Sequence, residues 1–105
     1  MTPETRVKNQ YLARIKQHKQ SGVMVDRPYV PGQYGEVGWP DRDGCVCGLA
    51  FYVEFKAGET AKMRGIQHKR RDQIKAAGGA YFCVYDEGTL QLFMEWLDET
   101  VRRNT

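Results

Sequence analysis

Polar and apolar residues alternate along residues 49–56, the pattern of a β-strand with one buried face. The apolar face carries Leu49, Phe51, Val53 and Phe55. Glu54 and Lys56 fall on the opposite face, where they point in the same direction. The pattern therefore predicts a strand whose second face presents an acid and a base side by side.

A β-hairpin is expected just before this strand. A two-residue turn at Cys47-Gly48, with glycine supplying the positive φ that such turns need, would fold residues 41–46 back onto it. That register would set Asp41 beside Glu54. The rival turn at Asp43-Gly44 would separate the two carboxylates.

Apolar residues at helical spacing predict three helices. The first begins at Thr2-Pro3-Glu4, which supplies a capping hydroxyl, a proline and an acid, and runs to about Gln20. The second covers residues 61–77, and the third starts at about Thr89. Their apolar stripes are Val7, Tyr11, Leu12 and Ile15 in the first helix, Met63, Ile66, Ile74 and Ala77 in the second, and Leu90, Phe93, Met94, Leu97 and Val101 in the third.

Two further strands are expected, at residues 23–30 and 80–85, and Gly78-Gly79 is expected to end the second helix. The resulting order, α-β-β-β-α-β-α, predicts an α/β sandwich with a mixed sheet. The glycine-rich residues 31–38 are expected to form a mobile loop beside the site. Three aromatic side chains could stack on nucleic-acid bases or pack against the core edge: Tyr29, Tyr34 and Trp39.

Composition indicates one small globular domain spanning residues 1–105. Hydrophobic residues make up 41% and charged residues 28% of the chain, as is usual for a globular protein. The first residues lack the apolar segment of a signal peptide, and no run approaches the length of a membrane span. We therefore expect a cytoplasmic protein with no membrane partner.

The three cysteines do not form a familiar motif. Cys45-x-Cys47 has the spacing of neither a zinc knuckle nor a redox pair, and Cys83 falls in an apolar strand where a reduced thiol is expected. A small zinc protein that uses Cys45 and Cys47 with His18 or His68 is one alternative.

Basic residues are concentrated on the second predicted helix, although the net charge is only +3. Residues 62–71 contain five basic residues and no acid, which is typical of a solvated helix face or of phosphate contact. Candidate nucleic-acid contacts there are Lys62, Arg64, His68, Lys69, Arg70 and Arg71. The last helix has acidic exposed positions and is expected to face away from nucleic acid.

Paired carboxylates need a cation. Asp41 and Glu54 about 5 Å apart would repel by roughly 3 kcal/mol at an effective dielectric near 20. Hard oxygen ligands suit Mg²⁺ or Mn²⁺. Lys56 would orient a water or neutralise charge on a phosphoryl oxygen. Glu4 either satisfies the helix dipole or points toward the site, and the Gln67 amide is expected to face the site.

At this point the motifs resemble those of a known family. Gly38-x-Pro40-Asp41, Glu54-x-Lys56 and Gln67, followed by Ala-Ala-Gly-Gly at residues 76–79, closely resemble the virus-type replication-repair nuclease (VRR-NUC) domain of the PD-(D/E)xK superfamily. Glu4 matches the helical acid that precedes the family's core, so the resemblance covers essentially the whole chain. It implies a restriction-endonuclease-like α-β-β-β-α-β core with a mixed central sheet flanked by helices.

The resemblance also implies a catalytic site. Asp41, Glu54 and the backbone carbonyl of Phe55 would ligate Mg²⁺ or Mn²⁺. Lys56 would position the attacking water, and Glu4 would support the metal shell through water or a second ion.

Gln67 would help to orient this site. The implied function is a metal-dependent DNA endonuclease in phage or bacterial DNA processing or repair, with junctions and flaps among its candidate substrates. Homodimers occur among such proteins, so a homodimer is one possible state. The alternative from another class is a nucleic-acid-binding module without chemistry, which would use the basic helices alone.

Overall fold

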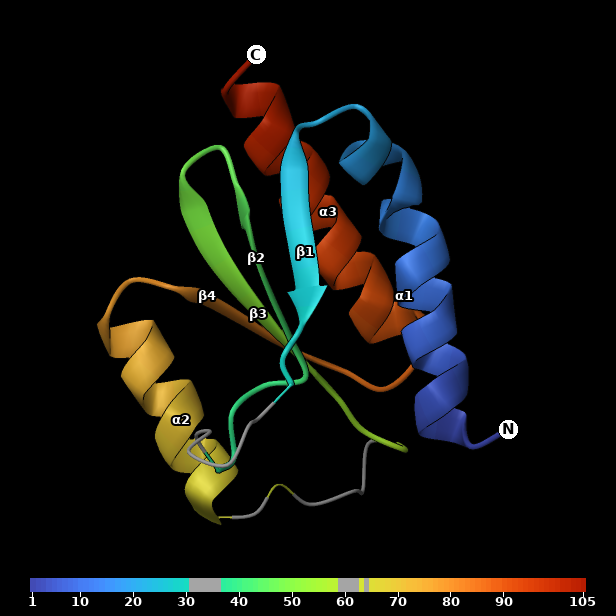
Figure 1. Ribbon diagram of the computed structural model, residues 1–105, viewed down its shortest axis with the longest axis vertical. Coiled ribbons are helices and arrows are strands. Elements are labelled where there is room, and N and C mark those ends of the chain that lie inside the picture. The colour runs from blue at the N-terminus through green and yellow to red at the C-terminus, as the bar shows by residue number, and fades with distance from the viewer. Residues whose placement is uncertain (31–36, 59–62, 64) are drawn as a thin grey trace.

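The computed structural model describes residues 1–30, 37–58, 63 and 65–105. Figure 1 shows helices and strands in the predicted α-β-β-β-α-β-α order, which is confirmed. The elements are α1 (Pro3–Gln20), β1 (Met24–Pro28), β2 (Arg42–Val46), β3 (Leu49–Phe55), α2 (Gly65–Ala76), β4 (Ala80–Val84) and α3 (Glu87–Arg103).

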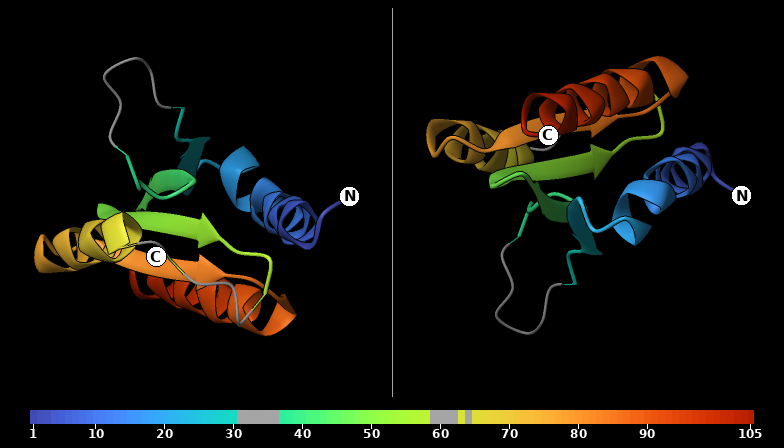
Figure 2. Two further views of the ribbon diagram at one scale, coloured as in Figure 1. Left: turned by 90° about the horizontal axis from the view of Figure 1, so that it is seen from below. Right: turned by 90° about the horizontal axis from the view of Figure 1, so that it is seen from above.

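The strands form one mixed sheet in the order β1-β2-β3-β4. Strand β2 is antiparallel to both β1 and β3, and β4 runs parallel to β3. Helices α1 and α3 cover one face of the sheet, while α2 lies against the other (Figure 2). The parallel pair needs a crossover connection, and α2 provides it.

The hairpin register is the one that the Cys47-Gly48 turn predicts. Val46 pairs with Leu49 and Arg42 pairs with Val53, so the rival turn at Asp43-Gly44 is excluded. Both turn residues have positive φ, 50° at Cys47 and 82° at Gly48, as a turn that matches the strand twist requires. Asp41, one residue before β2, therefore falls opposite Glu54.

The hydrophobic core lies between the sheet and the pair α1 and α3. Phe51, Val53 and Phe55 of β3 are buried on this face. The ring of Tyr11 meets Phe55 edge-on at 5.3 Å between centroids, and Phe93 packs 5.5 Å from Phe51. The stripes of α1 and α3 supply the rest of the core, so the apolar face of the central strand was assigned correctly.

Several predicted apolar positions do not join this core. On the α2 side of the sheet, Met63 and Ile66 are half-buried, and Ile74 is buried near Tyr52. Leu49 is 47% exposed because it begins β3 at the tip of the hairpin, and Ala77 is exposed because α2 has already ended at Ala76. The helix end itself is as predicted: Gly78 has a φ of 90°, and the Gly79 N–H donates to the Ile74 carbonyl at 2.9 Å.

Some boundaries differ from prediction. Helix α3 starts at Glu87, two residues before Thr89, because Asp86 is the N-cap and Thr89 completes a capping box with it. Helix α2 is first seen at Gly65, and residues 61–62 and 64 lie outside the described part. Both outer strands are shorter than expected. Helix α1 begins as predicted, with Thr2 accepting from the Thr5 N–H at 3.1 Å.

Gly44 in β2 has no room for a side chain. A Cβ there would lie 2.2 Å from the Val25 carbonyl oxygen and 2.3 Å from a ring carbon of Phe51. Gly44→Ala should therefore force the β1–β2 pair apart and lower the free energy of unfolding by about 3 kcal/mol. Urea unfolding measures this loss. Gly58→Ala, where a Cβ meets nothing within 4 Å, is the control, and equal midpoints for the two variants would contradict the steric argument.

Within the described part of the chain, no helix has the length and apolar character that crossing a bilayer requires.

Candidate active site

Asp41 and Glu54 lie opposite each other at the end of the sheet, close enough for the charge of Asp41 to raise the pKa of Glu54. The carboxylate of Asp41 accepts a hydrogen bond from the backbone N–H of Phe55 at 2.8 Å, so it reaches across to the end of β3. The backbone carbonyl of Asp41 accepts from the Tyr29 N–H, also at 2.8 Å, which extends the pairing of β1 and β2. Pro40 is fully buried and fixes the approach of the chain.

Gln67 links the acid and the base of the predicted motif. The ammonium of Lys56 donates to the Gln67 amide oxygen at 2.9 Å, and the Gln67 amide nitrogen donates to the Glu54 carboxylate at 3.1 Å. Lys56 also lies 3.7 Å from the same Glu54 oxygen. Because an ammonium only donates and a carboxylate only accepts, these partners fix the orientation of the amide. The expectation that Gln67 faces the site is therefore met.

Glu54 is held in a strongly perturbed environment. Its side chain is buried, with the residue only 4% exposed. Burial, followed by the negative charge of Asp41, raises the pKa of Glu54 to about 8; Lys56 opposes this shift and Glu4 adds to it. Burial and like charge both penalise the ionised acid. A bound cation would therefore stabilise the ionised form of Glu54.

Glu4 lies in the first turn of α1, at the same end of the sheet. A cavity of about 220 Å³ is lined by Glu4 and Asp41 together with Thr5, Lys8, Pro28, Arg42 and Phe55. Glu4 thus shares a cavity with Asp41, besides its place near the helix N-terminus. Lys8, one turn further along α1, brings a positive charge to the same cavity.

The donor set fits a hard divalent ion. The described residues contain no group of three or more His, Cys, Asp and Glu side chains arranged to hold a metal. Mg²⁺, however, is commonly bound through one or two carboxylates plus substrate phosphates and waters, rather than in an all-protein cage. Asp41 and Glu54 are two such carboxylates. Coordination by the carbonyl of Phe55 stays a prediction.

The zinc alternative is contradicted. Cys45 and Cys47 are both exposed on the hairpin, whereas His18 lies on α1 and contacts Asp98 of α3 at 2.9 Å. His68 is on α2. These side chains are all described, and they form no metal-binding group. Cys83 is half-buried rather than fully buried, and burial is the main cause of its raised pKa, so a reduced thiol is expected.

The basic residues of α2 are not equivalent. His68 and Lys69 are exposed, but Arg70 donates to the Val37 carbonyl at 3.1 Å, and Arg71 pairs with Asp72 at 3.0 Å. Both arginines are half-buried, so part of their hydrogen-bonding capacity is used within the protein. The predicted contacts Lys62, Arg64 and Tyr34 lie outside the described residues.

Trp39 packs on the sheet. Its ring meets Tyr52 edge-on at 5.5 Å and lies 6.2 Å from Tyr29. Of the two alternatives for these aromatics, packing at the edge of the structure is observed. Because Trp39 is only half-buried, stacking on a base stays a prediction.

The sequence interpretation missed a buried polar network beside the site, formed by Tyr11, Asp26 and Arg42. One signal was present. Met24 and Asp26 have the same parity in β1, and both are buried, whereas Val25 between them is 65% exposed. A charged residue on the inward side of a strand needs a partner, so strand alternation could have identified Asp26.

Comparison with solved structures finds a chain with a similar architecture. A chain described as "VRR_NUC domain" superposes with a TM-score of 0.75, covering 90% of the present chain and 97% of the other, at 22% sequence identity. No family model matches the sequence, and no curated protein matches it. At this identity the structural match shows a shared fold.

Proposed function

Because this chain has the fold of a VRR_NUC domain, we propose that it is a divalent-metal-dependent nuclease that hydrolyses phosphodiester bonds in DNA. One observation carries the proposal: the chain of contacts from Lys56 through Gln67 to the buried Glu54, next to Asp41. A buried acid with a raised pKa, placed beside a second acid and a base, is typical of a functional site.

The proposed division of labour follows from these positions. Asp41, Glu54 and the backbone carbonyl of Phe55 would hold Mg²⁺ or Mn²⁺. When bound, the ion would polarise a phosphoryl oxygen and lower the pKa of a water. Lys56 would position that water or stabilise charge on the phosphate, and Glu4 would support the ion from across the shared cavity.

Gln67 would keep Lys56 from forming a closer pair with Glu54. Its amide occupies one ammonium donor and one oxygen of Glu54 while adding no charge. The ammonium and the carboxylate would therefore stay adjacent, 3.7 Å apart, with the Gln67 amide bridging them. This leaves Glu54 able to accept a metal and Lys56 able to face a phosphate.

The substrate proposed is DNA, with junctions and flaps as candidate structures. Exposed basic residues of α2 would contact phosphates outside the site, and two copies of the chain would be needed for symmetric incision of a junction. Phage or bacterial DNA processing is the proposed setting.

A cleavage panel tests the proposal. Purified protein would be incubated with supercoiled plasmid, linear duplex, single strand, flap and four-way junction, each with Mg²⁺, Mn²⁺ or EDTA. We expect cleavage only with a divalent metal. Binding without cleavage on every substrate and with both metals would favour the non-catalytic binding module instead.

The contribution of α2 is separable from the chemistry. Lys69→Ala should weaken DNA binding and reduce the slope of log affinity against log salt by about 0.9, the value for one lost phosphate contact. Fluorescence anisotropy at several salt concentrations, with EDTA present, measures both. Lys16→Ala, an exposed position on α1 across the sheet, is the matched control. Identical slopes in the two variants would remove Lys69 from the interface.

A further inference from the structure

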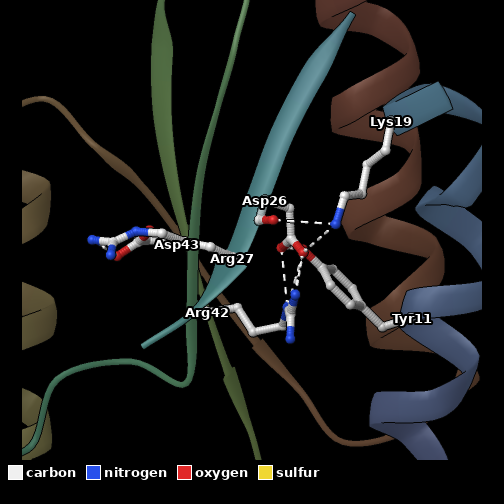
Figure 3. A network of polar contacts seen from close by, with 6 residues as sticks. All are labelled: Tyr11, Lys19, Asp26, Arg27, Arg42 and Asp43. Carbon is white, nitrogen blue, oxygen red and sulfur yellow. Dashed lines mark hydrogen bonds and ion pairs between the residues drawn. The ribbon is translucent and has the colours of Figure 1, made fainter. Parts of the chain in front are cut away.

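Asp26 of β1 is the centre of a buried polar network (Figure 3). Its carboxylate is fully buried and accepts from the Tyr11 hydroxyl at 2.7 Å and from Nε of Arg42 at 3.0 and 3.1 Å. Nη2 of Arg42 forms a further bond to the same carboxylate. Lys19 lies 3.6 Å from it and donates to the Asp26 carbonyl at 3.1 Å. The network therefore joins α1, β1 and β2.

Stability alone does not explain such a network. Removing charges from water costs several kcal/mol for each ion, and well-packed apolar residues often replace a buried ion pair without loss of stability. What the pair of Asp26 and Arg42 contributes is a fixed orientation, because the planar guanidinium of Arg42 meets the carboxylate in a defined geometry. Burial, and then the charge of Asp26, raise the pKa of Tyr11 well above its ordinary value, so its hydroxyl stays a donor.

The network adjoins two of the proposed site acids. Arg42 directly follows Asp41 in the chain and lines the same cavity as Asp41 and Glu4. Tyr11 lies seven residues after Glu4 on α1, about two turns along the same helix face. Arg42 thus fixes β2 against β1, and Tyr11 fixes α1 against β1, with Asp26 as the common anchor.

We propose that Tyr11, Asp26 and Arg42 are positioning residues, which hold α1 and β2 so that Glu4 and Asp41 line one cavity, where both would support a divalent ion. The proposal rests on the metal site of the proposed function. Without the network, α1 and β2 would remain packed on β1 through the apolar core, but they would lose the directional contacts through Asp26 that link the helix of Glu4 to the strand that follows Asp41.

The decisive variant is Tyr11→Phe/Asp26→Leu/Arg42→Met, in which the buried Tyr11 hydroxyl is removed together with its acceptor. Replacing the buried pair by apolar side chains of similar length should leave the free energy of unfolding near or above its original value. Affinity for Mn²⁺, measured by calorimetric titration in the absence of DNA, should nevertheless fall by at least about tenfold. A purely structural network predicts unchanged Mn²⁺ affinity in this variant, and that result would overturn the proposal.

Tyr11→Phe is the smaller test, because it removes only the hydroxyl. It should weaken Mn²⁺ binding several-fold, whereas Leu97→Ala, which empties a fully buried position of α3 and lowers stability by about 2–5 kcal/mol, should leave Mn²⁺ affinity within twofold. Equal Mn²⁺ affinity in Tyr11→Phe and the original protein would count against positioning.

The two proposals fail differently. Protein that binds Mn²⁺ in a network-dependent manner but cuts no DNA would refute the nuclease and support the positioning role. Protein that cuts DNA, but whose Mn²⁺ affinity is the same with and without the network, would support the nuclease and refute the positioning role. Absence of Mn²⁺ binding in the unaltered protein would overturn both.

Discussion

Asp41→Asn is expected to reduce DNA cleavage by about 10²–10³-fold, the size of effect seen when one electrostatic element of an active site is removed. The amide keeps the shape of the side chain and an oxygen that can accept from the Phe55 N–H. It loses the negative charge with which Asp41 would bind a divalent ion. Single-turnover cleavage with saturating enzyme measures the rate without interference from product release.

Lys56→Ala should be similarly damaging, because it removes the ammonium that lies beside Glu54 and Gln67. DNA affinity should change by no more than a few-fold in either variant, since α2 is intact. Asp43→Asn is the matched control: it makes the same chemical change two residues along the same sheet face, where Asp43 pairs with Arg27 at 2.8 Å. If Asp41→Asn and Lys56→Ala both cut at the original rate, the assignment of the active site is wrong.

The second large effect concerns pH in the metal-free protein. Glu54 ionises near pH 4.5 in an unfolded chain, whereas in the folded protein its pKa is about 8. Between these values the unfolded chain has released a proton that the folded protein retains, so the free energy of unfolding falls as pH rises. The loss begins near pH 4.5, is complete just above pH 8, and amounts to at most about 5 kcal/mol.

Urea unfolding in EDTA at several pH values between 5 and 9 tests this expectation. Glu54→Gln should remove most of the decline, since an amide does not titrate. Saturating Mg²⁺ should also remove it, because the ion favours the ionised carboxylate. Glu99 has a pKa lowered to about 2 by Arg102 and Arg103, so it affects stability only at more acidic pH. A stability that is constant from pH 5 to 8 in EDTA would show that Glu54 is not held in a charge-excluding site.

Local rules were sufficient for much of the fold. The alternation of residues 49–56 predicted which face of β3 is buried, but it left two hairpin turns open, Cys47-Gly48 and Asp43-Gly44, and the strand pairing shows that the chain uses the first. The start of α1 followed from Thr2 and Pro3. The start of α3 did not, because Asp86 and Thr89 are both good capping residues and only the structure shows that they act as a pair.

Some contacts of the candidate site could likewise be predicted from the sequence, and others could not. Asp41 and Glu54 come together through a hairpin of adjacent strands, so their proximity was readable from the chain. The contact of Gln67 was also inferable, since it lies next to apolar residues on its helix. The link between Asp26 and Arg42 was not inferred, because it depends on β1 pairing with β2 and on α1 covering that face. Neither sequence spacing nor composition encodes such a three-element contact.

The hairpin turn has a consequence for how this chain could vary through evolution. Cys47 and Gly48 are exposed and lie some six residues from the carboxylates, about 20 Å along an extended strand. Exposed loop tips usually tolerate insertions and deletions. Here one added or deleted residue would shift β2 along β3 and carry Asp41 away from Glu54. The tip of the hairpin should therefore keep its length in any active descendant, even while its side chains change freely.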